Sequence, residues 1–253
     1  MCLINFSFRS HPRYKLVIAA NRDEFYKRPT EKAHYWEDDP GILAGRDLMQ
    51  MGTWLGVSKT GRIAALTNFR DPSMPEAGKL SRGAIVHNYL KSDKQTEPFL
   101  RALKPEDYTG FNLIAGTADE IFYYNNTDQK PSPVDAGVHG LSNHFLDTPW
   151  PKVIKGKNYL DRYLSEHEEL DFAQLFDLLA DAEQAGETEL PNTGVGLEFE
   201  KILSPIFIKT ADYGTRSSTI VAVDMENNLT FAERVYQDGL LEVEQIFTFK
   251  IRK

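Results

Sequence analysis

MCLINFSFRSHPRYKLVIAANRDEF, residues 1–25, is the segment most indicative of the fold. Cys2–Phe8 is predicted to form a strand, and the apolar run Tyr14–Ala20 is predicted to form a second one. The His11-Pro12 step separates them, because proline lacks a backbone N–H and has a fixed φ. The two strands therefore form a hairpin, and the second ends in Asn21-Arg22-Asp23-Glu24, beside residue 2.

Cys2 is the only cysteine of the chain and directly follows the initiator methionine. Methionine aminopeptidases remove Met before a residue this small, which would leave a thiol and a free α-amine on one residue. A thiol has a pKa of ~8.5 and an α-amine one of ~7.7–8.0, so the amine can take the thiol proton near neutral pH. The alternative is a buried cysteine that only packs.

Composition describes an ordinary globular protein of 253 residues, 41% hydrophobic and 26% charged. We expect one domain over residues 1–253. The net charge of −8 argues against nucleic acid as the main partner. No apolar run reaches the ~18 residues of a membrane span or forms a signal peptide, and an unpaired thiol suits a reducing compartment, so we expect a cytoplasmic protein. No Cys/His cluster has zinc spacing, so we expect no metal and no cofactor.

The rest of the chain alternates between blocks of strands and pairs of helices. Further strands are predicted at Gly41–Gly45, Thr53–Ser58, Arg62–Asn68, Asn112–Gly116, Glu120–Tyr124, Val138–Ser142, Ile206–Lys209, Arg216–Val223, Leu229–Val235 and Gln245–Lys250. Helices are predicted from Ser81, as the cap, to Leu90, and at Thr96–Leu103, Lys152–Leu164 and Phe172–Ala182, with loops at Phe69–Gly78 and Gly186–Gly196. A turn is predicted at Asn227-Asn228.

This order favours an α+β fold, a four-layer α-β-β-α sandwich, because antiparallel hairpins predominate. The alternative is a doubly wound nucleotide-binding fold. No Gly-x-Gly-x-x-Gly follows a strand and no Gly-Lys-Ser/Thr loop occurs, which argues against that alternative.

Several motifs together resemble the NRDE family, also called the transport and Golgi organisation 2 family, which is named for Asn21-Arg22-Asp23-Glu24. The others are Met1-Cys2, Gly52–Val57, Leu66–Arg70 and Gly140–Asn143. More distantly, the layout resembles the N-terminal-nucleophile hydrolases of the penicillin V acylase and bile salt hydrolase type. Those enzymes cleave amides with an N-terminal cysteine, so the resemblance implies their sandwich fold and Cys2 as the nucleophile.

The resemblance also implies roles for other residues. Asp23 falls where those hydrolases hold the nucleophile's amine, Asn68 resembles a residue near the oxyanion hole, and Asn143 resembles an oxyanion donor. Arg216 resembles a late arginine of the family. One departure is that Ala20 stands where the hydrolases carry an arginine against the thiol. Alternation puts Arg22 on the same strand face, from which it either substitutes for that arginine or points away from the thiol.

We therefore expect catalytic roles for Cys2, Asp23, Asn68, Asn143 and Arg216, and substrate binding by Asn21, Arg22, Glu24 and Arg70. A side-chain amide on a developing oxyanion contributes ~2.7–4 kcal/mol, which suits the two catalytic asparagines. Trp54, Phe69, Tyr123, Tyr124 and Phe145 are candidates to line a pocket for an apolar acyl group. The simpler alternatives are turn asparagines, a surface ion pair at Arg216 and core aromatic residues.

The expected function is hydrolysis of a small amide with an apolar acyl group. The alternative is a non-enzymatic carrier, because the resembled family is associated with haem trafficking and with lipid or acyl-CoA metabolism. Arg22, Arg70 and Arg216 would then meet carboxylates or phosphates, and the Cys2 thiolate would ligate haem iron. A papain-like pair of Cys2 with His144 is a further alternative mechanism.

Overall fold

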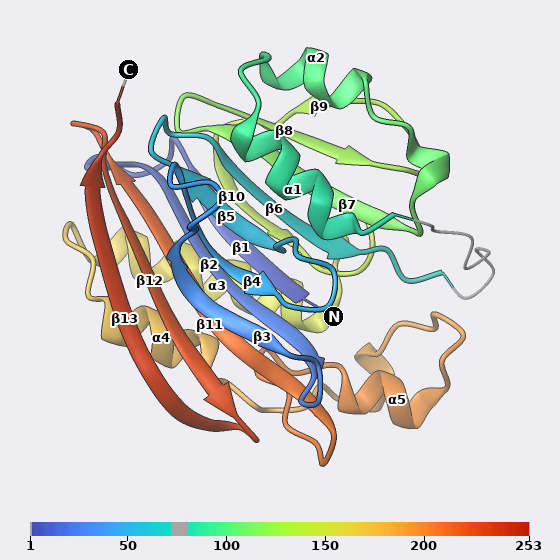
Figure 1. Cartoon of the computed structure of the whole chain (residues 1–253). Coiled ribbons are helices and arrows are strands. Elements are labelled where there is room, and N and C mark those ends of the chain that lie inside the picture. Colours follow the sequence, from blue (N-terminus) through green and yellow to red (C-terminus); the bar gives the residue numbers. More distant parts are fainter. Residues whose placement is uncertain (1, 72–79, 253) are drawn as a thin grey trace.

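Two antiparallel sheets form the centre of the computed structural model, which describes residues 2–71 and 80–252 (Figure 1). In spatial order, the first sheet contains β10 (Gly137–Leu141), β1 (Cys2–Phe8), β2 (Tyr14–Phe25), β11 (Tyr213–Asp224), β12 (Asn228–Gln237) and β13 (Leu240–Lys250). The second sheet contains β3 (Thr30–Tyr35), β4 (Ile42–Asp47), β5 (Leu55–Ser58), β6 (Ile63–Asn68), β7 (Phe111–Thr117), β8 (Glu120–Asn125) and β9 (Ser132–Pro133).

Helices cover the outer face of each sheet. α3 (Pro151–Glu166) and α4 (Phe172–Leu179) pack on the first sheet, and α1 (Arg82–Lys91) and α2 (Thr96–Arg101) pack on the second (Figure 1). Short helical segments lie in the connections: η1 (Pro105–Asp107), η2 (Glu187–Glu189) and α5 (Leu197–Ile202). The order of layers is α-β-β-α, which confirms the predicted fold class.

Alternation of side chains along β1 builds two of the three cores. Ile4 and Phe6 point between the sheets, where they belong to the same core as Leu55 of β5. Leu3 points the other way and packs in the core that contains Leu175 of α4. Cys2 shares the face of Ile4 and Phe6, since side chains two apart lie on one face of a strand. The Cys2 thiol therefore lies on the face of the first sheet that is turned toward the second sheet.

The opening hairpin is confirmed, with β1 and β2 paired from Cys2↔Arg22 to Phe8↔Leu16. The second strand is longer than its apolar run and continues through the tetrapeptide to Phe25. The turn at Asn227-Asn228 is also confirmed, and Asn227 has a φ of 65°. Most other predicted elements occur with bounds shifted by a few residues; α4 ends at Leu179 rather than at Ala182.

Two local predictions are wrong, and two elements of the fold were missed. Ile206–Lys209 is not a strand but forms a single bridge at Lys209, because its main chain bonds elsewhere: Ile206 O accepts from the Asn21 side chain and Phe207 N donates to Asp181 O. Ser81 precedes α1 but makes no side-chain capping bond. Strand β3 and helix α5 were not anticipated.

Part of the predicted loop Phe69–Gly78 lies outside the described residues, as does the predicted removal of Met1. Among the residues that the structure describes, no helix combines the length and apolar character needed to cross a membrane.

Candidate active site

Cys2 and Arg22 are direct partners across the β1–β2 ladder, so their side chains lie on the same face. The Cys2 side chain is nearly covered, with 9% of the residue exposed, and the Arg22 side chain is 12% exposed. The hairpin register thus decides which arginine faces the thiol. Arg22 takes the place beside it that Ala20, two residues earlier, cannot fill.

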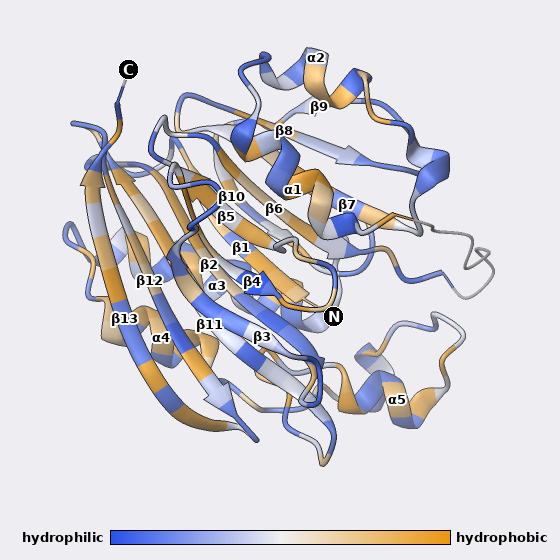
Figure 2. Cartoon of the chain, in the orientation of Figure 1, coloured by the Kyte–Doolittle hydropathy of each residue, from blue (hydrophilic) through white to orange (hydrophobic). Residues whose placement is uncertain are grey.

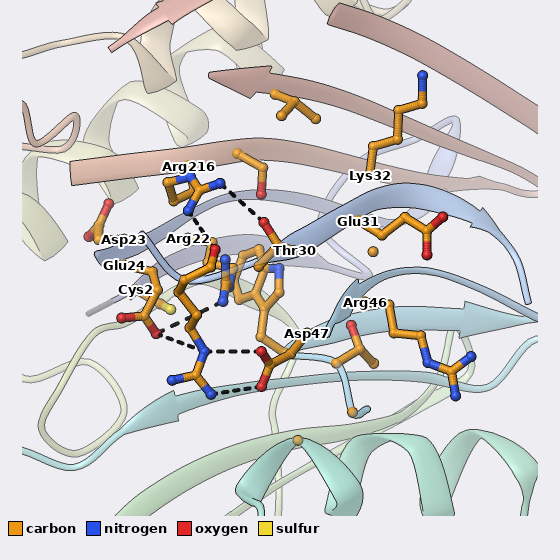
Figure 3. A pocket seen from close by; sticks show the side chains of 18 of the residues that line it. Cys2, Arg22, Asp23, Glu24, Thr30, Glu31, Lys32, Arg46, Asp47 and Arg216 are labelled. Carbon is orange, nitrogen blue, oxygen red and sulfur yellow. Dashed lines mark hydrogen bonds and ion pairs between the residues drawn. The ribbon is translucent and has the colours of Figure 1, made fainter. Parts of the chain in front are cut away.

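The thiol lies at one end of a cavity of about 560 Å³ between the two sheets. Figure 3 shows Cys2, Asp23 and Glu24 at that end and Lys32 and Arg46 at the opposite end. Of the nine sequence-predicted site residues, six line this cavity: Cys2, Arg22, Asp23, Glu24, Asn68 and Arg216.

Burial and charge act in opposite directions on the thiol. Burial raises the pKa of Cys2, and the nearby Asp23 carboxylate raises it further. Arg22 lowers the pKa of the same thiol, because a cation stabilises the thiolate. The buried sulfur therefore depends on adjacent cations for its reactivity.

Asp23 occupies the opposite side of β2 from Arg22, on the face that meets the helices. Its Oδ1 accepts a hydrogen bond of 2.8 Å from Thr215 Oγ1 on β11. Burial raises the pKa of this carboxyl, and Lys152 at the start of α3 opposes that shift. The Asp23 carboxyl and the Cys2 thiol therefore lie on opposite faces of the first sheet.

Asn143 and Asn68 are in contact, but only Asn68 lines the cavity. Asn143 Nδ2 donates to the main-chain oxygen of Asn68 at 2.9 Å, so one amide hydrogen of Asn143 is already used. The adjacent Ser142 Oγ donates to Cys2 O at 3.0 Å. Asn143 therefore positions Asn68, Ser142 contacts β1, and Asn68 is the asparagine of the pair that lines the cavity.

Arg216 does not point at the thiol. Its Nη1 donates to the main-chain oxygens of Phe25, Tyr26 and Arg28 at 3.0–3.1 Å, and its Nη2 donates to Thr30 Oγ1. Figure 3 shows this guanidinium directed at Thr30 and away from Cys2. The Arg216 guanidinium therefore holds the β2–β3 turn. The resemblance to the hydrolases had suggested a catalytic role for this residue.

Asn21 and Arg70, expected to bind substrate, lie outside the cavity lining. Asn21 is fully buried, and its amide donates to Leu179 O and Ile206 O beneath the helical layer. Arg70 forms an ion pair of 2.8 Å with the buried Glu200. Asn21 fastens connecting segments to the first sheet, since strand alternation turns residue 21 away from residue 22. Arg70 instead joins the segment after β6 to α5.

The expected apolar pocket is not what the thiol faces. Of the five aromatic candidates only Trp54 lines the cavity, whose other lining is mostly charged or polar. Tyr124 is buried in the core under α1 and α2, and Phe69 packs against His144 and Phe145. His144 is also absent from the lining, so the structure gives no support to a papain-like pair.

Sequence reasoning missed two basic residues near the thiol. Lys152 lies in the first turn of α3, and Arg82 is the first residue of α1. Both are electrostatically coupled to Cys2. The helix dipole disfavours a cation at a helix N-terminus, and this mismatch was the one signal that the sequence offered.

Comparison with known proteins gives relatives along almost the whole chain. The family described as Transport and Golgi organisation 2 matches residues 1–238. The mouse Transport and Golgi organization 2 homolog is 35% identical over 260 residues, and the human Transport and Golgi organization protein 2 homolog is 36% identical over 261 residues. Each alignment covers 94% of this chain and 94% of the relative.

Among solved structures, the chain is similar to the C2A mutant of a conjugated bile acid hydrolase from Clostridium perfringens. The TM-score is 0.56 at 10% sequence identity, and the alignment covers 100% of this chain and 97% of that chain. At this identity the likeness shows a shared fold, the N-terminal-nucleophile hydrolase sandwich.

Proposed function

The chain belongs to the Transport and Golgi organisation 2 family, and from its hydrolase-like fold and the cavity at Cys2 we propose that it is a cysteine N-terminal-nucleophile amidohydrolase acting on a small, non-peptide amide. One observation carries this proposal: the sole thiol lies at the end of a cavity, with Arg22 directly opposite it in the hairpin register. A free thiol suits the cytoplasm, where we place this activity.

The proposed reaction begins after removal of Met1. The α-amine of Cys2 takes the thiol proton, and the sulfur attacks the amide carbon, which forms a tetrahedral oxyanion. The carbon–nitrogen bond then breaks, and the α-ammonium returns the proton to the leaving amine. Water, deprotonated by the same α-amine, hydrolyses the thioester to a carboxylic acid and restores the thiol.

Three residues of the cavity lining have proposed roles in this reaction. Asp23 accepts a hydrogen bond from the α-ammonium and holds it beside the sulfur. Arg22 stabilises the thiolate, in line with its effect on the pKa of Cys2. The Asn68 side chain donates to the oxyanion, a contribution of ~2.7–4 kcal/mol in comparable sites. The charged lining favours a polar acyl group over the apolar one expected from the sequence.

The test is turnover of a panel of fluorogenic amides by wild type, Cys2→Ala and Cys2→Ser, together with intact mass of the wild-type protein after a single turnover. We expect no turnover by either variant, unchanged thermal melting, and an acyl adduct in the N-terminal peptide of wild type. Turnover retained by Cys2→Ala would refute the proposal.

A matched control addresses the α-amine. Protein released by a protease so that Cys2 is the first residue should be active. The same protein with one residue left in front of Cys2 should lose activity, because its α-amine is blocked while the thiol is unchanged. Equal activity of the two samples would show that another group is the base.

The second candidate is the carrier for haem or an acyl-CoA-like ligand. Arg22, Arg28 and Arg82 give the cavity cations for phosphates or carboxylates, which favours an acyl-CoA-like ligand. For haem, Cys2 is the single sulfur ligand in the described lining, which includes no histidine. Titration with haem by absorption and with acyl-CoA by calorimetry tests the carrier; without saturable binding of either, this candidate is rejected.

A further inference from the structure

Most arginines of the cavity already have acidic partners. Glu24 Oε2 lies 3.9 Å from Arg22 Nη2 and 3.7 Å from Arg28 Nε. Arg28 also pairs with Asp47, at 2.7 Å. These contacts pair the two arginines with the two carboxylates, so an anionic ligand would have to compete with Glu24 and Asp47 for either arginine.

Two further arginines of the cavity lining, Arg46 and Arg216, also have partners within the protein. Arg46 forms an ion pair of 2.6 Å with Asp38 and stacks its guanidinium over the Trp36 ring. Arg216 donates to three main-chain oxygens of the β2–β3 turn. A ligand anion would have to break these contacts.

Arg82 is different. It lines the cavity from the start of α1, and its one hydrogen bond in the described structure runs from Nη1 to Gly110 O at 3.1 Å. No acidic side chain of residues 2–71 or 80–252 forms an ion pair with it. A guanidinium has five N–H donors, so most of its capacity is unused. A partly buried cation without a counter-ion is unfavourable, and an anionic ligand would relieve that cost.

Arg82 and the thiol share one small cavity. Burial lowers the pKa of Arg82, and the nearby Cys2 and Glu24 oppose that shift. A cavity of about 560 Å³ is in the range that suits a small ligand. One molecule can therefore place its amide at Cys2 and a charged group at Arg82.

We propose that the substrate is a small anionic amide and that Arg82 receives its carboxylate. This inference rests on the proposed function, since it assigns the substrate class of the same site. Arg82 is a specificity residue in this scheme: planar guanidinium and carboxylate groups pair through two parallel hydrogen bonds. Two acidic side chains of the lining, Glu24 and Asp47, do not oppose binding, because they are held by Arg22 and Arg28.

The test compares two amides of equal length, glutaramate and valeramide, which differ by the terminal carboxylate. Binding to Cys2→Ala protein is measured by calorimetry, so that no turnover intervenes. We expect glutaramate to bind at least tenfold more tightly. Adding Arg82→Gln should abolish that preference, whereas Arg82→Lys should keep part of it, because a lysine keeps the charge but not the paired geometry.

Arg46→Gln is the matched control, an arginine of the same cavity whose charge is already paired with Asp38. It should leave the preference for glutaramate unchanged. Thermal melting checks that each variant is folded. Equal or absent binding of the two amides, or a preference that survives Arg82→Gln in folded protein, overturns the inference.

Hydrolysis separates this inference from the proposed function. Wild type is assayed with glutaryl and valeryl amides of 7-amino-4-methylcoumarin. If glutaramate binding depends on Arg82 but wild type cleaves neither coumarin amide and forms no acyl adduct, the anion site stands and the amidohydrolase proposal falls. If both are cleaved equally and Arg82→Gln leaves their ratio unchanged, the hydrolase stands and the anion site falls.

Discussion

Lys152 is a charged side chain held inside the protein, with 3% of the residue exposed. Its Nζ has no hydrogen-bond partner among the described residues. Burial lowers the pKa of Lys152 to about 8, while Asp23, Cys2 and Glu200 favour its charged form and Arg70 disfavours it. Since Lys152 in turn lowers the pKa of Asp23, we infer that its role is to keep that carboxyl ionised.

Replacing Lys152 by Met should change the pH dependence of turnover. Asp23 would lose an attractive charge, so its pKa would rise further. Because Asp23 acts as the carboxylate, the acid limb of the kcat/KM profile should move to higher pH, by about 1 pH unit. Lys157→Met, on the same helix but paired with Asp147 near the surface, should leave the profile unchanged. An unshifted acid limb in Lys152→Met would contradict this role.

At the scale of secondary structure, Arg216 joins β11 to the turn between β2 and β3. Its guanidinium supplies the hydrogen bonds for main-chain oxygens at residues 25, 26 and 28. The side chain is buried, with 8% of the residue exposed, so water does not readily replace it. This contact places β3 beside the cavity and lets two sheets share one charged lining.

Arg216→Gln should therefore destabilise the fold. Hydrogen bonds to a charged group are worth about 1.5–3 kcal/mol, and we expect a loss of unfolding free energy of that order. Urea unfolding measures it. Arg216→Lys should restore little, because one ammonium cannot reach the same set of carbonyls. Full stability with lost turnover would instead indicate the catalytic role that the sequence resemblance implied.

For the whole molecule, the packing of sheet on sheet decides stability. Phe231 of β12 is 1% exposed and lies in the core between the sheets, with Phe6 and Leu55. Figure 2 shows hydrophobic and hydrophilic residues alternating along the outer strand β13, where Ile246 is 54% exposed. The contribution of a hydrophobic residue to stability therefore depends on which face of the strand it occupies.

Phe231→Ala should lower the free energy of unfolding by about 3–5 kcal/mol, the usual cost of emptying a buried phenylalanine site. Ile246→Ala, on the neighbouring strand but exposed, should change it by less than about 0.5 kcal/mol. Urea unfolding of both variants provides the comparison. Similar losses in the two variants would show that β13 is covered in solution.

Local patterns made much of the fold predictable. The β1–β2 hairpin follows from two apolar runs around His11-Pro12, and the layers follow from the order of strand and helix blocks. The strand prediction for Ile206–Lys209 failed because an apolar run indicates burial but not which group the main chain bonds to. Here the main-chain oxygen of Ile206 accepts from the Asn21 side chain. Bounds also shifted because strands such as β11 continue through polar residues.

Local sequence patterns were enough to predict most of the strands and helices, the candidate nucleophile Cys2 and, through strand alternation, that Arg22 shares the face of Ala20. Three-dimensional packing was needed to show that Arg82 lies with Cys2 in one cavity, that Lys152 lowers the pKa of Asp23, and that Arg216 and Asn21 serve the fold. Strand alternation and turns depend on residues that are close in the sequence. The partner of a polar side chain depends instead on which distant segments the packing brings beside it.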